Sequence, residues 1–438
     1  MTAIAAKISK LIGEQADGIS WENLSSQWQQ RISSALINAN SPNCLVFPHT
    51  PQALSEILAI ANASSWRILS CGSGSKLNWG GLADNIDLVV STQKLNGIID
   101  HAVGDLTITV ESGVKLADLQ AAVKEQGQFL PLDPSYSQEA TIGGILATAD
   151  AGSWRQRYGG VRDMVLGVSF VRSDGQIAKA GGRVVKNVAG YDLMKLLTGS
   201  YGTLGVICQV TLRLYPLPET STTVVLTGEK DAIASASQTL LNSTLTPTAA
   251  DLISPGLVNQ LDLGNGIGLI VRFESVAESV KEQATKLVSI GQQLGLKANS
   301  YSDADETTLW QPFPNSMNSA ASDATILAKI GILPTESVHF LDQFSTLTDS
   351  QGFARINVSS GIGKLQLELE NGLEIVSKLR SHCQEKQGYL TILESPTDLK
   401  QKLEPWGYSG NALEIMKKIK QKFDPNAILN PGRFVGKI

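Results

Sequence analysis

A run of small residues at positions 69–81 is the feature that most limits how this chain can fold. It reads Leu-Ser-Cys-Gly-Ser-Gly-Ser-Lys-Leu-Asn-Trp-Gly-Gly and follows an apolar, β-prone segment, Trp66 to Leu69. Because residues 72–75 have small side chains or none, their main-chain N–H groups can surround an anion such as a pyrophosphate. Taken alone, however, the loop is more simply explained as a polar surface turn.

The loop matches neither of the two common nucleotide-binding signatures. A dinucleotide-binding G-x-G-x-x-G motif that began at Gly72 would need a glycine where the sequence has Leu77. No G-K-[ST] triplet follows, so the loop is not a P-loop either. The role of the loop therefore has to be inferred from the loop together with the other motifs of the chain.

Further clusters of turn-forming and small residues recur downstream. They are Pro131–Pro134, Ala140–Gly144, Arg157–Gly160 followed by Arg162 and Asp163, Lys186–Asp192, Gly199–Ile207 and Phe423–Arg433. Read alone, the segment 199–205 is a helix C-cap and turn, and the last cluster is a terminal turn. In this order and at these separations, the whole set resembles the FAD-binding domain of the vanillyl-alcohol oxidase (PCMH-type) flavoproteins.

The resemblance covers most of residues 41–219 and the C-terminal tail, and it looks closest to the FAD-binding E subunit of glycolate oxidase. It implies an α+β fold, in which a PCMH-type FAD-binding domain of two α+β subdomains precedes a cap domain with a helix-backed antiparallel sheet. The domains expected are a helical lead-in at 1–40, the FAD-binding domain at 41–219, a cap like the C-terminal domain of FAD-linked oxidases at 220–420, and a tail at 421–438 that returns to the flavin.

Hydrophobic periodicity adds the elements around these clusters. It predicts strands at 66–69, 87–90, 206–215, 222–226 and 267–273, hairpins at 98–110 and 165–180, and helices at 54–63, 116–123, 193–197, 231–242 and 277–294. A similar pattern continues from Ala354 to Ile392. The prolines at 216 and 218 mark the preferred boundary between the two main domains.

The resemblance also assigns the residues of an FAD site. The pyrophosphate would lie on the loop at 72–76, the adenine would meet main-chain groups at 205–207, and the tail would bring Asn430 near the flavin. The residues expected to bind FAD are Gly72, Ser73, Gly74, Ser75, Lys76, Gly80, Gly81, Pro131, Asp133, Pro134, Thr141, Ile142, Gly143, Gly144, Thr148, Tyr158, Gly205, Val206, Ile207 and Asn430. Lys76 either adds a positive charge at the pyrophosphate or is an exposed surface lysine.

The glycine loop contains no histidine between residues 69 and 81. Some relatives in the resembled family attach FAD covalently through a histidine at this place. We therefore predict FAD that is bound non-covalently. Cys71 is the loop's one nucleophile-like residue, and a buried small side chain is its simpler role.

The residues needed to oxidise a hydroxy acid are harder to identify in the sequence. Oxidation of a 2-hydroxy acid needs a base for the hydroxyl proton and a cation for the carboxylate. Similar flavin dehydrogenases hold a divalent metal and the substrate with an H-x-G-D-G-N-type cap segment, but His49, His101, His339 and His382 all lie outside any such segment. We therefore expect no metal site and assign no catalytic residue. Three arginines near the flavin motifs would bind a substrate carboxylate, neutralise the pyrophosphate or lie on the surface: Arg155, Arg157 and Arg162.

Length and composition place the chain among globular proteins of two or three domains. It has 438 residues, of which 42% are hydrophobic and 18% charged. The net charge is −5 and no long basic run occurs, so nucleic acid is not an expected partner. The four cysteines are far apart, which argues against a disulfide framework or an iron–sulfur cluster bound by this chain alone.

The sequence predicts no direct insertion into a membrane. No stretch approaches about 18 uninterrupted apolar residues, the length that a spanning helix needs. The N-terminus lacks the charged-then-apolar plan of a secretory signal. We expect a cytoplasmic protein, with any attachment to a membrane made through a partner.

The resemblance implies an FAD-binding subunit of a multi-subunit glycolate dehydrogenase, which oxidises glycolate to glyoxylate and passes electrons to an acceptor other than oxygen. The expected partners are a catalytic flavoprotein subunit and an iron–sulfur subunit, and the small 2-hydroxy acid is taken by the complex. This chain would either relay electrons or stabilise the assembly. The alternatives are a self-sufficient FAD-dependent oxidoreductase of another hydroxylated substrate, and a structural subunit with a vestigial flavin pocket.

Overall fold

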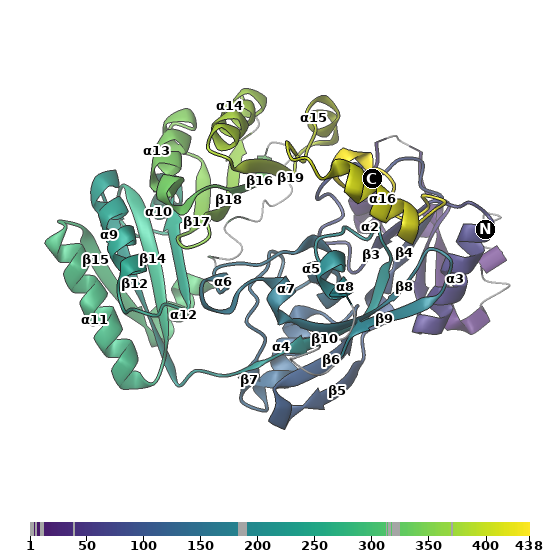
Figure 1. The fold of residues 1–438 in the computed structure, drawn as a ribbon, viewed down its shortest axis with the longest axis horizontal. Coiled ribbons are helices and arrows are strands. Elements are labelled where there is room, and N and C mark those ends of the chain that lie inside the picture. Colours follow the sequence, from purple (N-terminus) through teal and green to yellow (C-terminus); the bar gives the residue numbers. More distant parts are fainter. Residues whose placement is uncertain are drawn as a thin grey trace.

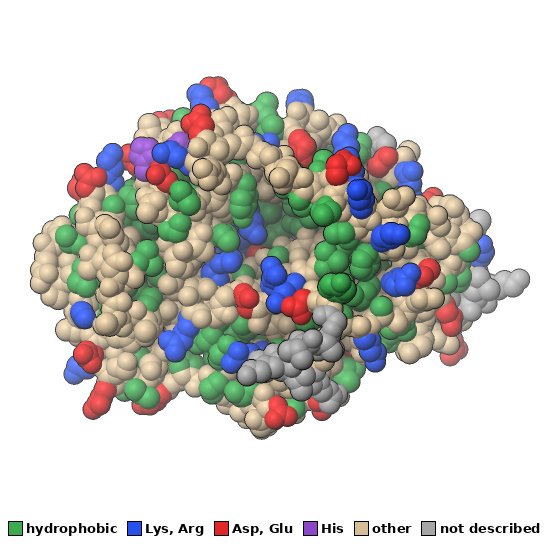
Figure 2. Space-filling view, viewed as in Figure 1, with side chains coloured by type: hydrophobic (Ala, Val, Ile, Leu, Met, Phe, Trp, Pro, Cys, Tyr) green, Lys and Arg blue, Asp and Glu red, His purple; other side chains and the backbone are tan. Residues whose placement is uncertain are grey.

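The computed structural model describes residues 13–37, 40–182, 191–311, 325–368 and 371–438, together with Ile4, Lys7, Ile8, Phe313 and Met317. Parts of the lead-in expected at 1–40, and residues 186–190 of the cluster at 186–192, lie outside these described residues. The chain forms a mixed α+β structure, as expected, in which two parts face each other across a hollow (Figures 1 and 2).

The first part begins with a four-stranded sheet in the order β1-β2-β4-β3. Its elements are β1 (Ala16–Ser20), α2 (Ser26–Ser33), β2 (Cys44–Pro48), α3 (Pro51–Ala63), β3 (Ile68–Cys71) and β4 (Leu88–Ser91). Strands β2, β4 and β3 are parallel, and apolar residues of α3 and α2 cover their two faces. Helix α3 begins where it does because Thr50 caps it, accepting a hydrogen bond from the Ala53 N–H at 3.1 Å.

The expected helical lead-in is wrong for residues 16–20. These residues form the edge strand β1, because their main chain pairs antiparallel with the free edge of β2. The helical part of the expectation holds for α2, which buries Ile32 and ends at Ser33.

A five-stranded antiparallel sheet follows, in the order β5-β6-β10-β8-β9. Its strands are β5 (Ile98–Ala102), β6 (Thr107–Glu111), β8 (Val165–Val171), β9 (Ile177–Gly181) and β10 (Val206–Arg213), and a short pair is formed by β7 (Gln128–Phe129) and β11 (Tyr215–Pro216). Its helices are α4 (Leu116–Lys124), α5 (Ile142–Thr148), α6 (Arg155–Tyr158), α7 (Val161–Met164) and α8 (Leu193–Leu197). The pairing of β5 with β6 and of β8 with β9 confirms the two predicted hairpins.

The second part is one antiparallel sheet of eight described strands, which we call the cap sheet. Its order is β15-β12-β14-β13-β17-β18-β16-β19. The strands are β12 (Thr220–Gly228), β13 (Ala249–Ile253), β14 (Ile267–Ser275), β15 (Lys297–Ser302), β16 (Thr325–Gly331), β17 (Phe353–Asn357), β18 (Ile362–Glu368) and β19 (Tyr389–Glu394).

Helices cover the outer face of the cap sheet, as the resemblance implied (Figure 1). They are α9 (Lys230–Asn242), α11 (Ala277–Gln293), α13 (Ser337–Leu347) and α14 (Gly372–Glu385). Buried residues of these helices and of alternate strand positions form the largest apolar core, which leaves the inner face of the sheet free to meet the first part. The shorter helices α10 (Pro255–Gln260) and α12 (Asp303–Trp310) belong to a smaller core with Val225, Ile253 and Ile270.

The C-terminal segment returns to the first sheet after α15 (Thr397–Lys402) and α16 (Leu413–Phe423) (Figure 1). The Ile68 N–H donates to the Ile428 carbonyl at 2.7 Å, and the Asn430 N–H donates to the Ile68 carbonyl at 2.8 Å. The tail thus lies along β3, directly before the glycine loop.

Candidate active site

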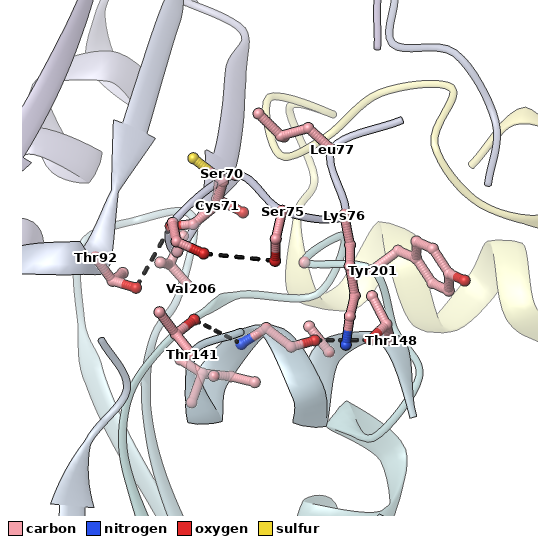
Figure 3. Close-up of a pocket in the computed structure, with 18 of the residues that line it drawn as sticks. Ser70, Cys71, Ser75, Lys76, Leu77, Thr92, Thr141, Thr148, Tyr201 and Val206 are labelled. Carbon is pink, nitrogen blue, oxygen red and sulfur yellow. Dashed lines mark hydrogen bonds between the residues drawn. The ribbon is translucent and has the colours of Figure 1, made fainter. Parts of the chain in front are cut away.

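The glycine loop after β3 forms one wall of a cleft with an empty volume of about 740 Å³. The first turns of α5 form a second wall, and the segment 201–207 that leads into β10 forms a third (Figure 3). Asn430 of the tail also lines the cleft. The cleft therefore lies where the two sheets of the first part meet.

Main-chain donors point to an anion at the loop end of this cleft. The N–H groups of Ser73, Gly74, Ser75 and Lys76 donate no hydrogen bond to any residue that the structure describes. Unpaired main-chain donors are costly when they are shielded from water, unless a ligand accepts from them. Adjacent free donors of this kind form a concave site for a phosphate or diphosphate.

Glycine is required at positions 72 and 74 of the loop, because a side chain at either position would clash with a neighbouring residue. A Cβ atom on Gly72 would lie 2.0 Å from Oγ1 of Thr141, and one on Gly74 would lie 2.8 Å from the Trp28 ring. Gly74 also has a φ of +80°, which residues with side chains rarely adopt. The loop can thus approach α5 only as a bare main chain.

Lys76 is buried and paired, so the alternative of an exposed surface lysine is wrong. Its Nζ lies 2.8 Å from Oδ2 of Asp150, while Nζ of Lys364 on β18 lies 2.7 Å from Oδ1 of the same carboxylate. Ser135 completes the group, since its N–H donates to Oδ2 at 2.8 Å and its hydroxyl accepts from Lys364 at 2.6 Å. Burial raises the pKa of Asp150, but the two ammonium groups outweigh burial and hold that pKa well below its usual range.

The tail contributes two buried polar residues to the cleft. Asn430 accepts from the Ser70 N–H at 2.7 Å and donates to the Tyr201 carbonyl at 2.5 Å, which joins β3 to the segment before β10. Arg433 donates to the Gly81 carbonyl at 2.7 Å and has no acidic partner within the described part of the chain. Burial lowers the pKa of Arg433 to about 10, which leaves a positive charge at the cleft at neutral pH.

A second pocket, with an empty volume of about 460 Å³, adjoins the cleft at Thr148, which lines both. We call it the acid pocket, after Asp150 and Asp251, which line it. Residues 149–155 line it on the side of the first part, and the inner face of the cap sheet lines the other side. Figure 2 shows Lys and Arg side chains gathered in the hollow between the two parts.

Three cations lie side by side on the cap side of the acid pocket. In the strand register, Arg355 of β17 is opposite Lys364 of β18, and Lys364 is opposite Lys329 of β16. All three line the pocket. Like charges on directly opposed strand residues are unfavourable, so such a row needs negative charge nearby.

The described residues supply that negative charge for two of the three cations. Lys364 pairs with Asp150, and Arg355 is close enough to Asp133 and Asp251 to oppose the rise that burial causes in their pKa values. The Lys329 side chain forms no ion pair or hydrogen bond with a described residue. Burial lowers the pKa of Lys329, and the nearby Asp150 opposes that shift. An ammonium group held in a partly buried pocket without a counter-ion favours the binding of a small anion.

Most of the residues expected to bind FAD line the cleft. These are Gly72, Ser73, Gly74, Ser75, Lys76, Thr141, Gly143, Gly144, Thr148, Gly205, Val206, Ile207 and Asn430. The structure thus brings together segments that are up to about 360 residues apart in the chain, as the Ser70–Asn430 hydrogen bond illustrates.

The remaining expected residues do not line the cleft. They are Gly80, Gly81, Pro131, Asp133, Pro134, Ile142 and Tyr158. Gly81 instead donates its N–H to the Arg433 carbonyl at 3.1 Å, and Asp133 accepts from the Ser153 N–H at 2.7 Å. Ile142 belongs to the apolar core, and Tyr158 packs its ring against Phe129.

Sequence analysis missed several lining residues. They are Tyr201, Gly202 and Arg433 in the cleft, and Asp150, Lys329, Arg355 and Lys364 in the acid pocket. Lys329 did carry a signal, since it is the single charge in the strand Thr-Ile-Leu-Ala-Lys-Ile-Gly, where a lone lysine is unusual. The partner of Lys364, by contrast, is 214 residues away and has no local signal.

The described residues contain no group of three or more His, Cys, Asp or Glu side chains that could hold a metal ion. His339 and His382 do approach each other, with ring centroids 5.8 Å apart, but they lie on α13 and α14 on the outer side of the cap sheet. Among the described residues, no helix is long and apolar enough to cross a membrane.

Two family matches coincide with these parts of the structure. Residues 42–181 match the FAD-binding domain family, and residues 399–434 match the C-terminal domain of FAD-linked oxidases. The first range contains the glycine loop and α5, and the second contains Asn430 and Arg433.

Curated relatives match over different lengths. Glycolate oxidase subunit GlcD of Bacillus subtilis is 26% identical over 422 residues, covering 90% of this chain and 89% of that protein. Mitochondrial D-lactate dehydrogenase [cytochrome] of Arabidopsis thaliana is 27% identical and covers 98% of this chain and 81% of that protein. Glycolate oxidase subunit GlcE of Escherichia coli is 39% identical over 171 residues, but it covers only 39% of this chain and 48% of that protein. The relatives thus support the wider group of FAD-dependent oxidoreductases and do not single out the E subunit of glycolate oxidase.

A solved structure has the same fold. The crystal structure of p-cresol methylhydroxylase with substrate bound superposes with a TM-score of 0.76 at 16% identity, covering 98% of this chain and 96% of that chain. This similarity shows a PCMH-type fold.

The residues of the cleft fit FAD. The free N–H groups at 73–76 suit its diphosphate, and glycines at 72 and 74 allow that close approach. The main chain at 205–207 and the side chain of Asn430 line the rest of the cleft. When bound, FAD supplies an acceptor for two electrons from a substrate.

Proposed function

We propose that this chain, an FAD-dependent oxidoreductase with a PCMH-type fold, is the FAD-binding subunit of a dehydrogenase for small 2-hydroxy acids such as glycolate. One observation carries the proposal: the pocket that adjoins the cofactor cleft has a row of three cations on its cap side. A substrate carboxylate would supply negative charge that the described residues do not.

The relatives support this substrate class. The names of GlcD and GlcE refer to glycolate, and that of the Arabidopsis relative refers to D-lactate, and both compounds are 2-hydroxy acids. Oxidation of glycolate to glyoxylate removes the hydroxyl proton and, from the neighbouring carbon, a hydride that carries the two electrons. Within the chain, the cations of the acid pocket would fix the carboxylate, and the cap sheet would shield the reacting carbon from water.

Partners follow from the same proposal. We propose a complex with a catalytic flavoprotein subunit and an iron–sulfur subunit, which would carry electrons to an acceptor other than oxygen. Such a complex would also provide any attachment to a membrane.

Anaerobic mixing of the purified FAD-loaded chain with glycolate or D-lactate tests the proposal. Loss of the visible absorbance of oxidised flavin in the chain alone is the expected result, because the acid pocket lies within this chain. Absence of flavin reduction by every small 2-hydroxy acid, with and without partners, would contradict it.

A second candidate function is an electron-relay or assembly subunit that does not oxidise substrate itself. The segment of 39% identity with GlcE favours it, as does the lack of a metal-binding group among the described residues. In that case the flavin of the isolated chain stays oxidised with glycolate, and it is reduced only in the presence of the partner subunits.

A further inference from the structure

Two cations line the acid pocket from its two sides. Lys329 comes from β16 of the cap, and Arg155 comes from α6 of the first part; both line the pocket. Neither side chain forms an ion pair or a hydrogen bond within the described part of the chain, although Asp150 acts on Lys329 and Arg155 acts on Asp251 through space. We propose that Arg155 and Lys329 form a two-sided clamp for the carboxylate of a small 2-hydroxy acid.

The electrostatics of the pocket support a bound anion between these two groups. Burial lowers the pKa of Lys329; Asp150 opposes this shift, and Arg155 adds to it by a smaller amount. Asp150 is already bound to two other ammonium groups, those of Lys76 and Lys364. Neither Lys329 nor Arg155 therefore has a bonded carboxylate, and the carboxylate of a ligand between them would form charge-assisted hydrogen bonds with both.

The neighbouring charges explain why Lys329 rather than Arg355 takes this role. Arg355 faces Asp133 and Asp251, and it also contacts the Ser153 hydroxyl at 3.4 Å. The other charged residue in the cross-strand row, Lys364, is held by Asp150. Lys329 is thus the cation of the row that has no ion-pair partner among the described residues.

The clamp joins the two parts of the molecule through the ligand. One of its residues belongs to the cap sheet and the other to the segment that follows α5, whose Thr148 lines the cofactor cleft as well. A bound acid would therefore lie beside the cofactor and also hold the cap against the first part. This inference rests on the proposed function for the identity of the ligand, but the anion site itself does not.

A ligand that cannot be oxidised tests the clamp without relying on turnover. We choose 2-hydroxy-2-methylpropanoate, which has the hydroxyl and carboxylate groups but no hydrogen on the carbon between them. Its dissociation constant for the FAD-loaded protein is measured by calorimetry, with the flavin difference spectrum as a second readout. We expect roughly 10- to 100-fold weaker binding in Lys329→Met and in Arg155→Met, the loss typical of one charged hydrogen-bonding partner.

Matched controls separate the clamp from a general effect of charge. Arg157→Met removes an exposed arginine from the same helix as Arg155, and Lys297→Met removes an exposed lysine from the same sheet as Lys329. Both are expected to bind the ligand as the wild type does. Lys329→Arg keeps the charge and should recover most of the affinity, which also shows that the position tolerates substitution.

The pH dependence gives an independent readout. Lys329 must be protonated to bind an anion, and its lowered pKa means that affinity falls with rising pH earlier than for an ordinary lysine. In Lys329→Arg that fall should move to higher pH, because arginine does not titrate in this range. Arg155, Asp150 and Lys364 face the same pocket and are unchanged in this comparison.

The outcomes distinguish the inference from the function on which it rests. Wild-type affinity in both Lys329→Met and Arg155→Met would overturn the clamp, even if glycolate reduces the flavin. Loss of affinity in both variants, with no flavin reduction by any 2-hydroxy acid, would support the clamp as an anion site and overturn the proposed function.

Discussion

Lys364 of the cap and Asp150 of the first part form a buried ion pair, with Nζ 2.7 Å from Oδ1 and side chains that are 8% and 1% exposed. The other carboxylate oxygen binds Lys76 of the glycine loop at 2.8 Å. One carboxylate thus connects the glycine loop to the sheet that covers the acid pocket. We infer that the geometry of the cleft and the position of the cap depend on each other.

Asp150→Asn should destabilise the protein strongly. The substitution leaves two buried ammonium groups facing a neutral side chain, and removal of one partner from a buried ion pair typically costs about 3–5 kcal/mol. The free energy of unfolding in urea, measured with and without FAD, checks this. Glu374→Gln is the control, because its pair with Lys378 is exposed and screened by solvent, so its loss is expected to have little effect. Equal effects of the two substitutions would contradict the role given to Asp150.

Gly74→Val should reduce FAD binding without unfolding the chain. The backbone at Gly74 has a φ of +80°, and a Cβ there would meet the Trp28 ring at 2.8 Å. Strain of this kind costs roughly 1–3 kcal/mol, so we expect about a 5- to 150-fold weaker FAD affinity, measured by fluorescence titration. Gly104→Val is the matched control, because Gly104 lies in the 3-10 turn between β5 and β6 with no atom within 4 Å of its added Cβ. Unchanged FAD affinity in Gly74→Val would place the diphosphate elsewhere.

The flavin should be released completely when the protein is denatured. Cys71 lines the cleft, but burial raises the pKa of its thiol to about 12, so the thiol is not the thiolate that covalent attachment requires. After acid precipitation, we expect all of the yellow colour in the supernatant, for the wild type and for Cys71→Ser alike. Flavin that migrates with the denatured polypeptide would refute this prediction.

Lys400 should make stability depend on pH. It is buried, it donates to the carbonyls of Leu393 and Asn78, and burial lowers its pKa to about 7 from an ordinary value of 10.5. Between these two values the unfolded chain holds a proton that the folded chain has lost, so the free energy of unfolding rises with pH across this window. Relative to Lys400→Met, the stability of the wild type should therefore increase from pH 7 to pH 10. A constant difference over that range would contradict the lowered pKa.

Local patterns in the sequence predicted the elements of the fold well, and the reasons are visible at particular residues. Leu54, Ile57 and Leu58 recur at helical spacing, and they are buried on one face of α3. The turn of the second hairpin could be predicted from three adjacent turn-forming residues, Ser173-Asp-Gly175. Strand β1 was missed, because its pairing with β2 is settled by tertiary contact rather than by its own polar sequence, Ala-Asp-Gly-Ile-Ser.

The two halves of the site differed in how far the sequence could predict them. The cofactor cleft depends on glycines at fixed spacing, such as Gly72 and Gly74, which are recognisable without a structure. The acid pocket depends on Lys329 and Lys364, whose relation arises only from the register of β16 and β18. Arg155 was a candidate for a substrate carboxylate, but the residue that faces it across the pocket could be found only in three dimensions.

The most direct measurement is a crystal structure of the FAD-loaded protein with 2-hydroxy-2-methylpropanoate. We predict that the diphosphate of FAD accepts hydrogen bonds from the N–H groups at 73–76, and that the carboxylate of the ligand bridges Lys329 and Arg155. Density for the diphosphate away from this loop, or a ligand that contacts neither Lys329 nor Arg155, would contradict the account.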